Sequence, residues 1–383
     1  MQIKKISAII ECVRKVRFFS FIVPLFFICL GSASAQTAND WWFTLERGRQ
    51  MYRQGNYGRA LIAFEDARRQ RRAMYERLER DFIEMLSSWE ARRLGDSLDW
   101  VERLVQERAL FAPAAVALEE LNFRFPGERF NNSVSQALAA LGSLKDYPEA
   151  EYWIGRVYLA EGELGLALSQ FQRALSMRAS LKNPGYATEI LYRIANIHRI
   201  RQEFNEMERA LLMVLETDAL WSGSGFERQA MSRLLENDGV DRFLTMFRYA
   251  NIQSEAAHRR LGFFYFDTGR HGRAQEHLMF SFLIQNTIII EEVMRSRHGF
   301  VFMNLNALFA EIGSNRVLLD FIEESEYYRT AYFLAVSLFA TGRAASARGI
   351  WAFLANQNRA GEWSSRSASQ LANPQVPRAI GMP

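Results

Sequence analysis

Hydrophobic and small residues recur along this chain at spacings that predict α-helices following glycine turns. In GNYGRALIAFEDA, residues 55–67, an alanine, a phenylalanine and an alanine follow Gly55 four and three positions apart, as on one helical face. The stretch GELGLALSQFQRA, residues 162–174, repeats this spacing. The four registered copies are Gly55, Ala60, Phe64, Ala67; Gly162, Ala167, Phe171, Ala174; Gly269, Ala274, Leu278, Ser281; and Gly342, Ala347, Trp351, Leu354.

Another helical face precedes each of these glycines, as in IGRVYLAEG and LGFFYFDTG. The predicted unit is therefore helix, glycine turn, helix. Glycine at the turn adopts a positive φ without a Cβ clash, so one helix stops and the chain reverses. Small residues such as Gly155 and Gly262 on the first helix let the two backbones approach, and the large residue of the second helix fills the adjacent space. One such hairpin cannot bury its own apolar face, so neighbouring hairpins must stack on it.

The same unit is predicted at further, less regular positions. The mean spacing of the turns is roughly 36 residues, which predicts about nine hairpins in one continuous helical repeat domain over residues 36–357. The predicted turn residues are Gly55, Gly95, Gly127, Gly162, Gln202, Gly239, Gly269, Gly313 and Gly342. Residues 358–383 lack helical periodicity and are predicted to form a loose tail.

These motifs resemble the tetratricopeptide repeat family, whose unit of 34 residues has W-x2-L-G-x2-Y in its first helix and A-x3-F in its second. The A-x3-F spacing is present at Ala60–Phe64 and Ala167–Phe171, and L-G-x2-Y at Leu261–Tyr265. The family's tryptophan and closing proline are missing at the corresponding positions of these copies; the tryptophan positions hold Thr44, Glu151, His258 and Ala331. The resemblance implies an all-α fold, a right-handed superhelical solenoid of stacked hairpins whose first helices line a concave face.

The resemblance also implies which residues face that concave surface. They are rich in arginine and aromatic residues, the types that dominate the energetics of protein interfaces. The candidate partner-binding residues are Arg49, Arg53, Tyr152, Arg156, Tyr192, Asn196, Arg259, Phe263, Phe266 and Tyr332. For each aromatic residue the alternative is that its ring closes the gap between adjacent first helices. Of the positions that clamp a terminal carboxylate in some members of the family, only Asn196 matches, which argues against that form of recognition.

The first 35 residues have the layout of a secretory signal peptide. A basic start containing Arg14 and Arg17 precedes the apolar stretch FFSFIVPLFFICL and the small residues Ala33 and Ala35. Thirteen apolar residues are too few to span a bilayer, because a spanning helix needs about 20. We therefore expect cleavage before Gln36, export to the periplasm, and no transmembrane segment in the mature chain.

Cleavage would change both the charge and the cysteine content. The full chain carries 47 basic and 43 acidic residues, and residues 1–35 contain five basic residues and Glu11, so the mature chain has no formal net charge. A basic footprint for nucleic acid is therefore absent. Both cysteines, Cys12 and Cys29, would also be removed, so no disulfide is expected.

The sequence contains little that indicates catalysis. The five histidines form no HExxH or comparable ligand pair, and the mature chain has no glycine-rich phosphate loop or nucleophile elbow. Adjacent acidic pairs such as Glu119–Glu120 point in different directions on a helix, and the arginine-rich stretch 66–81 alternates with acidic residues as a solvated helix does. We expect that the protein binds no metal ion, uses no cofactor and has no enzyme activity.

The sequence thus predicts an exported bacterial scaffold or adaptor of the cell envelope that binds a protein or peptide partner in its concave groove without catalysis. The alternative is a protein that binds a small ligand or an envelope polymer, such as a transport accessory or a peptidoglycan-associated factor, with the same aromatic residues stacked on it.

Overall fold

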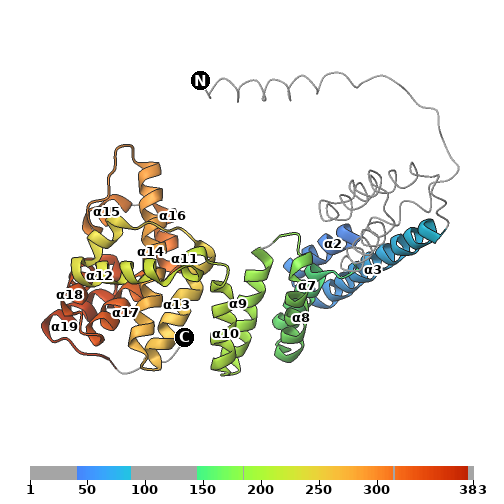
Figure 1. The fold of residues 1–383 in the computed structure, drawn as a ribbon, viewed down its shortest axis with the longest axis horizontal. Coiled ribbons are helices and arrows are strands. Elements are labelled where there is room, and N and C mark those ends of the chain that lie inside the picture. Colours follow the sequence, from blue (N-terminus) through green and yellow to red (C-terminus); the bar gives the residue numbers. More distant parts are fainter. Residues whose placement is uncertain (1–40, 88–144, 184, 314, 378–383) are drawn as a thin grey trace, which may run out of the picture.

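A computed structural model describes residues 41–87, 145–183, 185–313 and 315–377, and all regular secondary structure within these ranges is helical. The all-α fold predicted from the sequence is therefore confirmed for these residues. Figure 1 shows the helices following one another along the longest axis, from α2 and α3 at the right of the view to α17–α19 at the left.

Five helical pairs form the body of the described structure. They are α2 (Trp41–Arg53) with α3 (Tyr57–Ser87), α7 (Pro148–Ala160) with α8 (Leu164–Ser176), α9 (Gly185–Ile200) with α10 (Phe204–Leu215), α13 (Ile252–Asp267) with α14 (His271–Ser296), and α17 (Tyr327–Ala340) with α18 (Ala344–Ala355). The second helix of each pair packs on the first helix of the next, so α3 contacts α7, α8 contacts α9, α10 contacts α13 and α14 contacts α17. The pairs thus stack in chain order, as repeats that bury each other's apolar faces do.

The turns inside these pairs share one backbone geometry. Each contains a residue with a positive φ at a position predicted from the sequence: Gly55, Gly162, Gln202, Gly269 and Gly342. The amide that follows this residue donates to the carbonyl five residues earlier, at 2.7–2.9 Å. This is the Schellman motif, which satisfies carbonyl groups at the end of the first helix. Glutamine replaces glycine in only one of these five turns.

The close approach predicted inside the pairs is present at three of them. A Cβ added to Gly48, Gly155 or Gly262 would lie 2.6, 2.9 or 2.6 Å from the large side chain of the second helix. Real Cβ atoms do not approach other atoms so closely, so glycine sets the distance between the two helices. The large residues are Phe64, Phe171 and Leu278, all of which are fully buried.

Two predicted turns do not form pairs in the stack, which corrects the expectation of nine hairpins. Gly239, with φ 82° and ψ 177°, interrupts α12 (Gly225–Met246), and Gly313 lies between the short helices α15 (Leu305–Ile312) and α16 (Arg316–Glu324). Helix α12 packs on α14 and α18, and α15 and α16 pack on α14. These helices therefore cover existing pairs instead of adding new ones. Gly95 and Gly127 lie outside the described residues.

The expectation of a loose C-terminal tail is wrong for residues 358–372. They form the 3-10 helix η4 (Asn358–Ala360) and helix α19 (Glu362–Ala372), which packs on α18 and α17. Gln370 donates to the hydroxyl of Tyr332 at 3.1 Å and to the carbonyl of Gln375 at 2.9 Å. The physical reason is that the last pair of a helical stack leaves an apolar face, which a terminal helix must cover.

Glu236 on α12 ties this helix to the last pair. Its carboxylate accepts hydrogen bonds from Gln275 at 2.8 Å and from Arg343 at 2.9 Å, and its carbonyl accepts one from Ser346 at 2.8 Å. Burial opposes the charge, but the hydrogen bonds from Gln275, Ser232 and Arg343 hold the pKa of Glu236 below its ordinary value. We name this set of contacts the Glu236 clasp.

Two histidines are buried where the short helix α11 (Ala219–Ser222) meets α13 and α14. The Nδ1 atoms of His258 and His277 lie 3.1 Å apart, so one ring donates its proton and the other accepts it. Trp221 of α11 contacts both rings. Burial, with a smaller contribution from Arg228, lowers the pKa of His258 to about 3, and burial lowers the pKa of His277 well below its ordinary value. Both rings are therefore neutral at neutral pH.

We expect Gly262→Ala to destabilise the protein by about 1–3 kcal/mol, because the added methyl group would overlap the side chain of Leu278. Urea unfolding followed by circular dichroism measures the change. Gly272→Ala is the matched control, since a Cβ at this α14 position meets no atom within 4 Å. Equal stability of the two variants would contradict the proposed origin of the helix spacing.

We expect stability to fall as the pH is lowered from 7.5 to 5.5. Below a pKa of 6.5 the two histidines bind protons in the unfolded state, whereas in the folded state they stay neutral because their pKa values are lowered. Their contribution to stability is therefore complete above pH 6.5 and decreases below it. The loss approaches about 1.4 kcal/mol per pH unit for each histidine. Thermal unfolding in this pH range measures it. Replacing His258 and His277 by glutamine should flatten the dependence, whereas His298→Gln, at an exposed site, should retain it.

Candidate binding groove

A cavity of about 270 Å³ is lined by residues of α9, α10 and α13 and by Glu326 at the start of α17. Its floor is apolar, formed by Ala195, Met207, Leu211 and Phe263. Its polar lining consists of Asn196, Arg199, Arg259, Arg260 and Glu326. We call this the smaller cavity.

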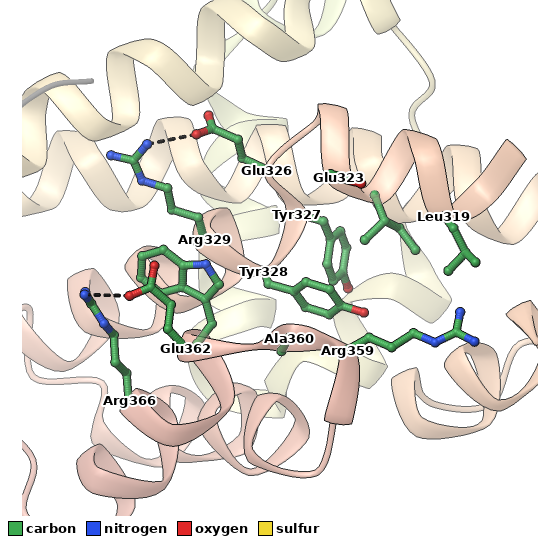
Figure 2. A pocket seen from close by; sticks show the side chains of 12 residues that line it. Leu319, Glu323, Glu326, Tyr327, Tyr328, Arg329, Arg359, Ala360, Glu362 and Arg366 are labelled. Carbon is green, nitrogen blue, oxygen red and sulfur yellow. Dashed lines mark hydrogen bonds and ion pairs between the residues drawn. The ribbon is translucent and has the colours of Figure 1, made fainter. Parts of the chain in front are cut away.

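A larger cavity of about 770 Å³ shares one lining residue, Glu326, with the smaller cavity. It is formed by α16, α17, η4 and α19, and its lining includes Tyr328, Arg359 and Trp363. In the view of Figure 2, the ion pairs Arg329–Glu326 and Arg366–Glu362 lie to the left, and Tyr328 and Arg359 lie to the right. The two cavities together are called the binding groove below.

Glu326 is held by arginines on both sides. Its Oε1 accepts a hydrogen bond from Arg329 at 2.9 Å, and its Oε2 accepts one from Arg259. Arg259 is fixed in turn by the buried carboxylate of Glu255, at 3.1 Å. Glu326 has φ 48° and ψ 40°, the left-handed conformation that residues other than glycine adopt rarely.

Arginines also connect consecutive first helices through aromatic rings. Arg156 of α7 lies 4.8 Å from the ring centroid of Tyr52 on α2. Arg260 of α13 lies 5.4 Å from that of Tyr192 on α9, and Arg329 of α17 lies 4.4 Å from that of Phe263 on α13. Each contact is within the range of a cation–π interaction. These contacts place arginine side chains of one first helix against aromatic rings of the preceding one.

The structure brings three of the predicted residues together in the smaller cavity: Asn196, Arg259 and Phe263. Arg49 lies elsewhere, over the ring of Trp153 at 5.2 Å, and donates to the hydroxyl of Tyr186 at 3.1 Å. Arg53 is exposed at the end of α2. The predicted residues near the N-terminus of the stack therefore do not line the binding groove.

Most of the predicted aromatic residues are buried between helices. The exposed fraction is 0% for Tyr152, 6% for Phe263, 3% for Phe266 and 4% for Tyr332. Burial and a hydrogen bond to Glu189 raise the pKa of Tyr152 above its usual range. Their environment agrees with the alternative considered from the sequence, in which these rings fill gaps between adjacent first helices.

Tyr192 has a specific structural contact. Its hydroxyl donates to the carbonyl of Gln253 at 2.6 Å and accepts from the amide of Ala257 at 3.0 Å, two groups that an α-helix normally pairs with each other. Burial raises the pKa of this hydroxyl. Tyr192 therefore joins α9 to the first turn of α13.

Several residues of the binding groove were not predicted. They are Arg199, Arg260, Glu326, Arg329, Arg359, Trp363 and Arg366. Arg199 lies three residues after the predicted Asn196 on α9, and Trp363 and Arg366 fall in the segment expected to be a loose tail. The tryptophan of that segment is the one signal in the sequence that indicates a packed helix there.

The described residues provide no cluster of three or more histidines, cysteines or carboxylates that could hold a metal ion. None of the described helices has the length and apolar character needed to cross a bilayer.

No protein-family model matches the chain. A protein of Treponema pallidum (strain Nichols), described as uncharacterized, is 27% identical over 337 residues. The match covers 87% of this chain and 90% of that protein, so the likeness extends over most of both chains.

Proposed function

We propose that this protein is an exported, non-catalytic scaffold of the bacterial periplasm that binds a protein or peptide partner in the binding groove. In this proposal the stacked pairs form a right-handed superhelical solenoid of the tetratricopeptide type. The Schellman turns, the contacts between small and large residues and the stacking order support this part of the proposal. The basic and apolar layout of residues 1–35 supports export.

The composition of the binding groove is the observation that carries the proposed role. Arg199, Arg259 and Arg260 line the smaller cavity together with the apolar residues of its floor, which include Phe263. Arginine forks bind carbonyl and carboxylate groups in fixed directions, and an apolar floor accepts side chains of a partner. A polypeptide offers both kinds of group along an extended chain.

A photo-crosslinking residue in place of Asn196 should capture a discrete polypeptide in intact cells, because this position lies in the smaller cavity. The same residue in place of Arg209, on the exposed face of α10, is the control. Changing both Arg259 and Arg260 to glutamine should reduce capture at least about tenfold, as the loss of buried charged contacts does in other interfaces. Helicity measured by circular dichroism should stay unchanged. Equal capture from both positions would contradict binding in the groove.

The volume of the larger cavity favours a second candidate, a protein that binds a small ligand or a piece of envelope polymer. Ligand sites commonly measure about 300–1,000 Å³, and this cavity of about 770 Å³ offers Tyr328 and Trp363 for stacking. Native mass spectrometry of the protein purified from its own envelope separates the two candidates. A small mass that is retained by the normal protein and lost from Trp363→Ala would favour the second candidate; an unchanged protein mass would argue against it.

A further inference from the structure

Glu326 occupies a position that a ligand carboxylate would fill. Its two carboxylate oxygens each accept a hydrogen bond from a different arginine, Arg259 of α13 and Arg329 of α17. Both guanidinium groups are positioned by further contacts, Arg259 by the buried Glu255 and Arg329 by the ring of Phe263. The two arginines are thus held in place by groups other than Glu326, on opposite sides of one carboxylate.

The backbone of Glu326 makes this position unusual. The residue is in the left-handed region, where a side chain with a Cβ costs free energy. It precedes α17, and its side chain makes no cap hydrogen bond to that helix. The interactions of the Glu326 carboxylate are therefore its ion pairs with Arg259 and Arg329.

The surroundings of this carboxylate are positively charged. The described lining of the binding groove contains more arginines than glutamates: Arg199, Arg259, Arg260, Arg329, Arg359 and Arg366 against Glu323, Glu326 and Glu362. The side chain of Glu326 is 35% exposed, so a group from solvent has access to the same place. An incoming carboxylate would therefore meet a net positive surface and a carboxylate that it can replace.

We propose that the ligand of the binding groove is an acidic peptide segment, and that Glu326 is a built-in competitor which a ligand carboxylate displaces from Arg259 and Arg329. This proposal rests on the proposed function and names the chemistry of its partner. The apolar floor formed by Met207, Leu211 and Phe263 favours a peptide with an apolar side chain beside its acidic ones. An acidic sugar chain would leave this floor without a matching group.

Displacement has a consequence for selectivity. A ligand with a single carboxylate gains little free energy of binding by displacing Glu326, because its ion pairs with the arginines replace equivalent ones. A segment with several carboxylates also reaches Arg260, which Glu326 does not contact in this structure. The groove thus favours ligands with several acidic groups over isolated ones.

The test uses a labelled octapeptide of six glutamates and two leucines with blocked ends, and fluorescence anisotropy as the measurement. Glu326→Gln should bind this peptide about three- to tenfold more tightly than the unchanged protein, because the competing charge is removed. Glu326→Asn should do the same, since asparagine tolerates the left-handed conformation. Circular dichroism establishes that each variant is folded.

The controls separate displacement from a general effect of charge. Glu206→Gln makes the same change of charge on α10, where Glu206 pairs with Arg209, and should leave the affinity within about twofold. Adding Arg259→Gln and Arg329→Gln to Glu326→Gln should abolish the gain, because the two arginines are its source. The matched peptide with glutamines should not respond to any of these changes.

Unchanged or weaker binding of the acidic peptide by folded Glu326→Gln and Glu326→Asn would overturn the proposal. Tighter binding of a galacturonate oligomer than of the acidic peptide would overturn the assignment to a peptide. The crosslinking experiment at Asn196, repeated in the Glu326→Gln protein, separates this failure from failure of the proposed function. Continued capture of a polypeptide without any gain for the acidic peptide would reject displacement and leave the groove as a binding site.

Discussion

The distance between paired helices depends on residues that lack a Cβ atom. At Gly48, Gly155 and Gly262 a side chain of the second helix occupies the space that a Cβ would need. Close packing at these points brings the helices into contact along their length, and the left-handed residue in the following turn reverses the chain within a few residues. Stacking follows from this geometry, because each tight pair leaves a continuous apolar face for the next.

The stack also determines what its first helices offer to solvent. Most of the predicted aromatic rings on the first helices are buried between helices, as the low exposure of Tyr152 and Phe266 shows. Arginines from the following helix lie across some of these rings, for example Arg329 over Phe263. The smaller cavity is therefore lined by arginines together with apolar side chains, a chemistry different from the aromatic surface expected from residue types alone.

The sequence was sufficient to predict the helical pairs wherever local rules control them. A turn glycine and a small residue facing a large one have the same meaning in every pair, so Gly162, Gly155 and Phe171 could be interpreted without a structure. Gly239 and Gly313 have the same residue type, yet their helices cover α14, because tertiary contacts override the local signal there. The site was predicted only in part, since Asn196 and Arg259 follow the repeat register, whereas the position of Glu326 depends on how three separate helices converge.

The Glu236 clasp distinguishes the C-terminal half from a simple row of repeats. Pairs that touch only their neighbours can fold one after another, but Glu236 and Arg343 are 107 positions apart in the chain. During synthesis on the ribosome, the pairs from α7 to α10 can pack soon after they emerge, whereas the part from α12 onward, which supplies the remaining walls of the binding groove, completes its fold only once Arg343 and Ser346 have been made. Translation from the N-terminus thus lets the pairs α7–α8 and α9–α10 fold first, and the helices joined by the Glu236 clasp fold together at the end.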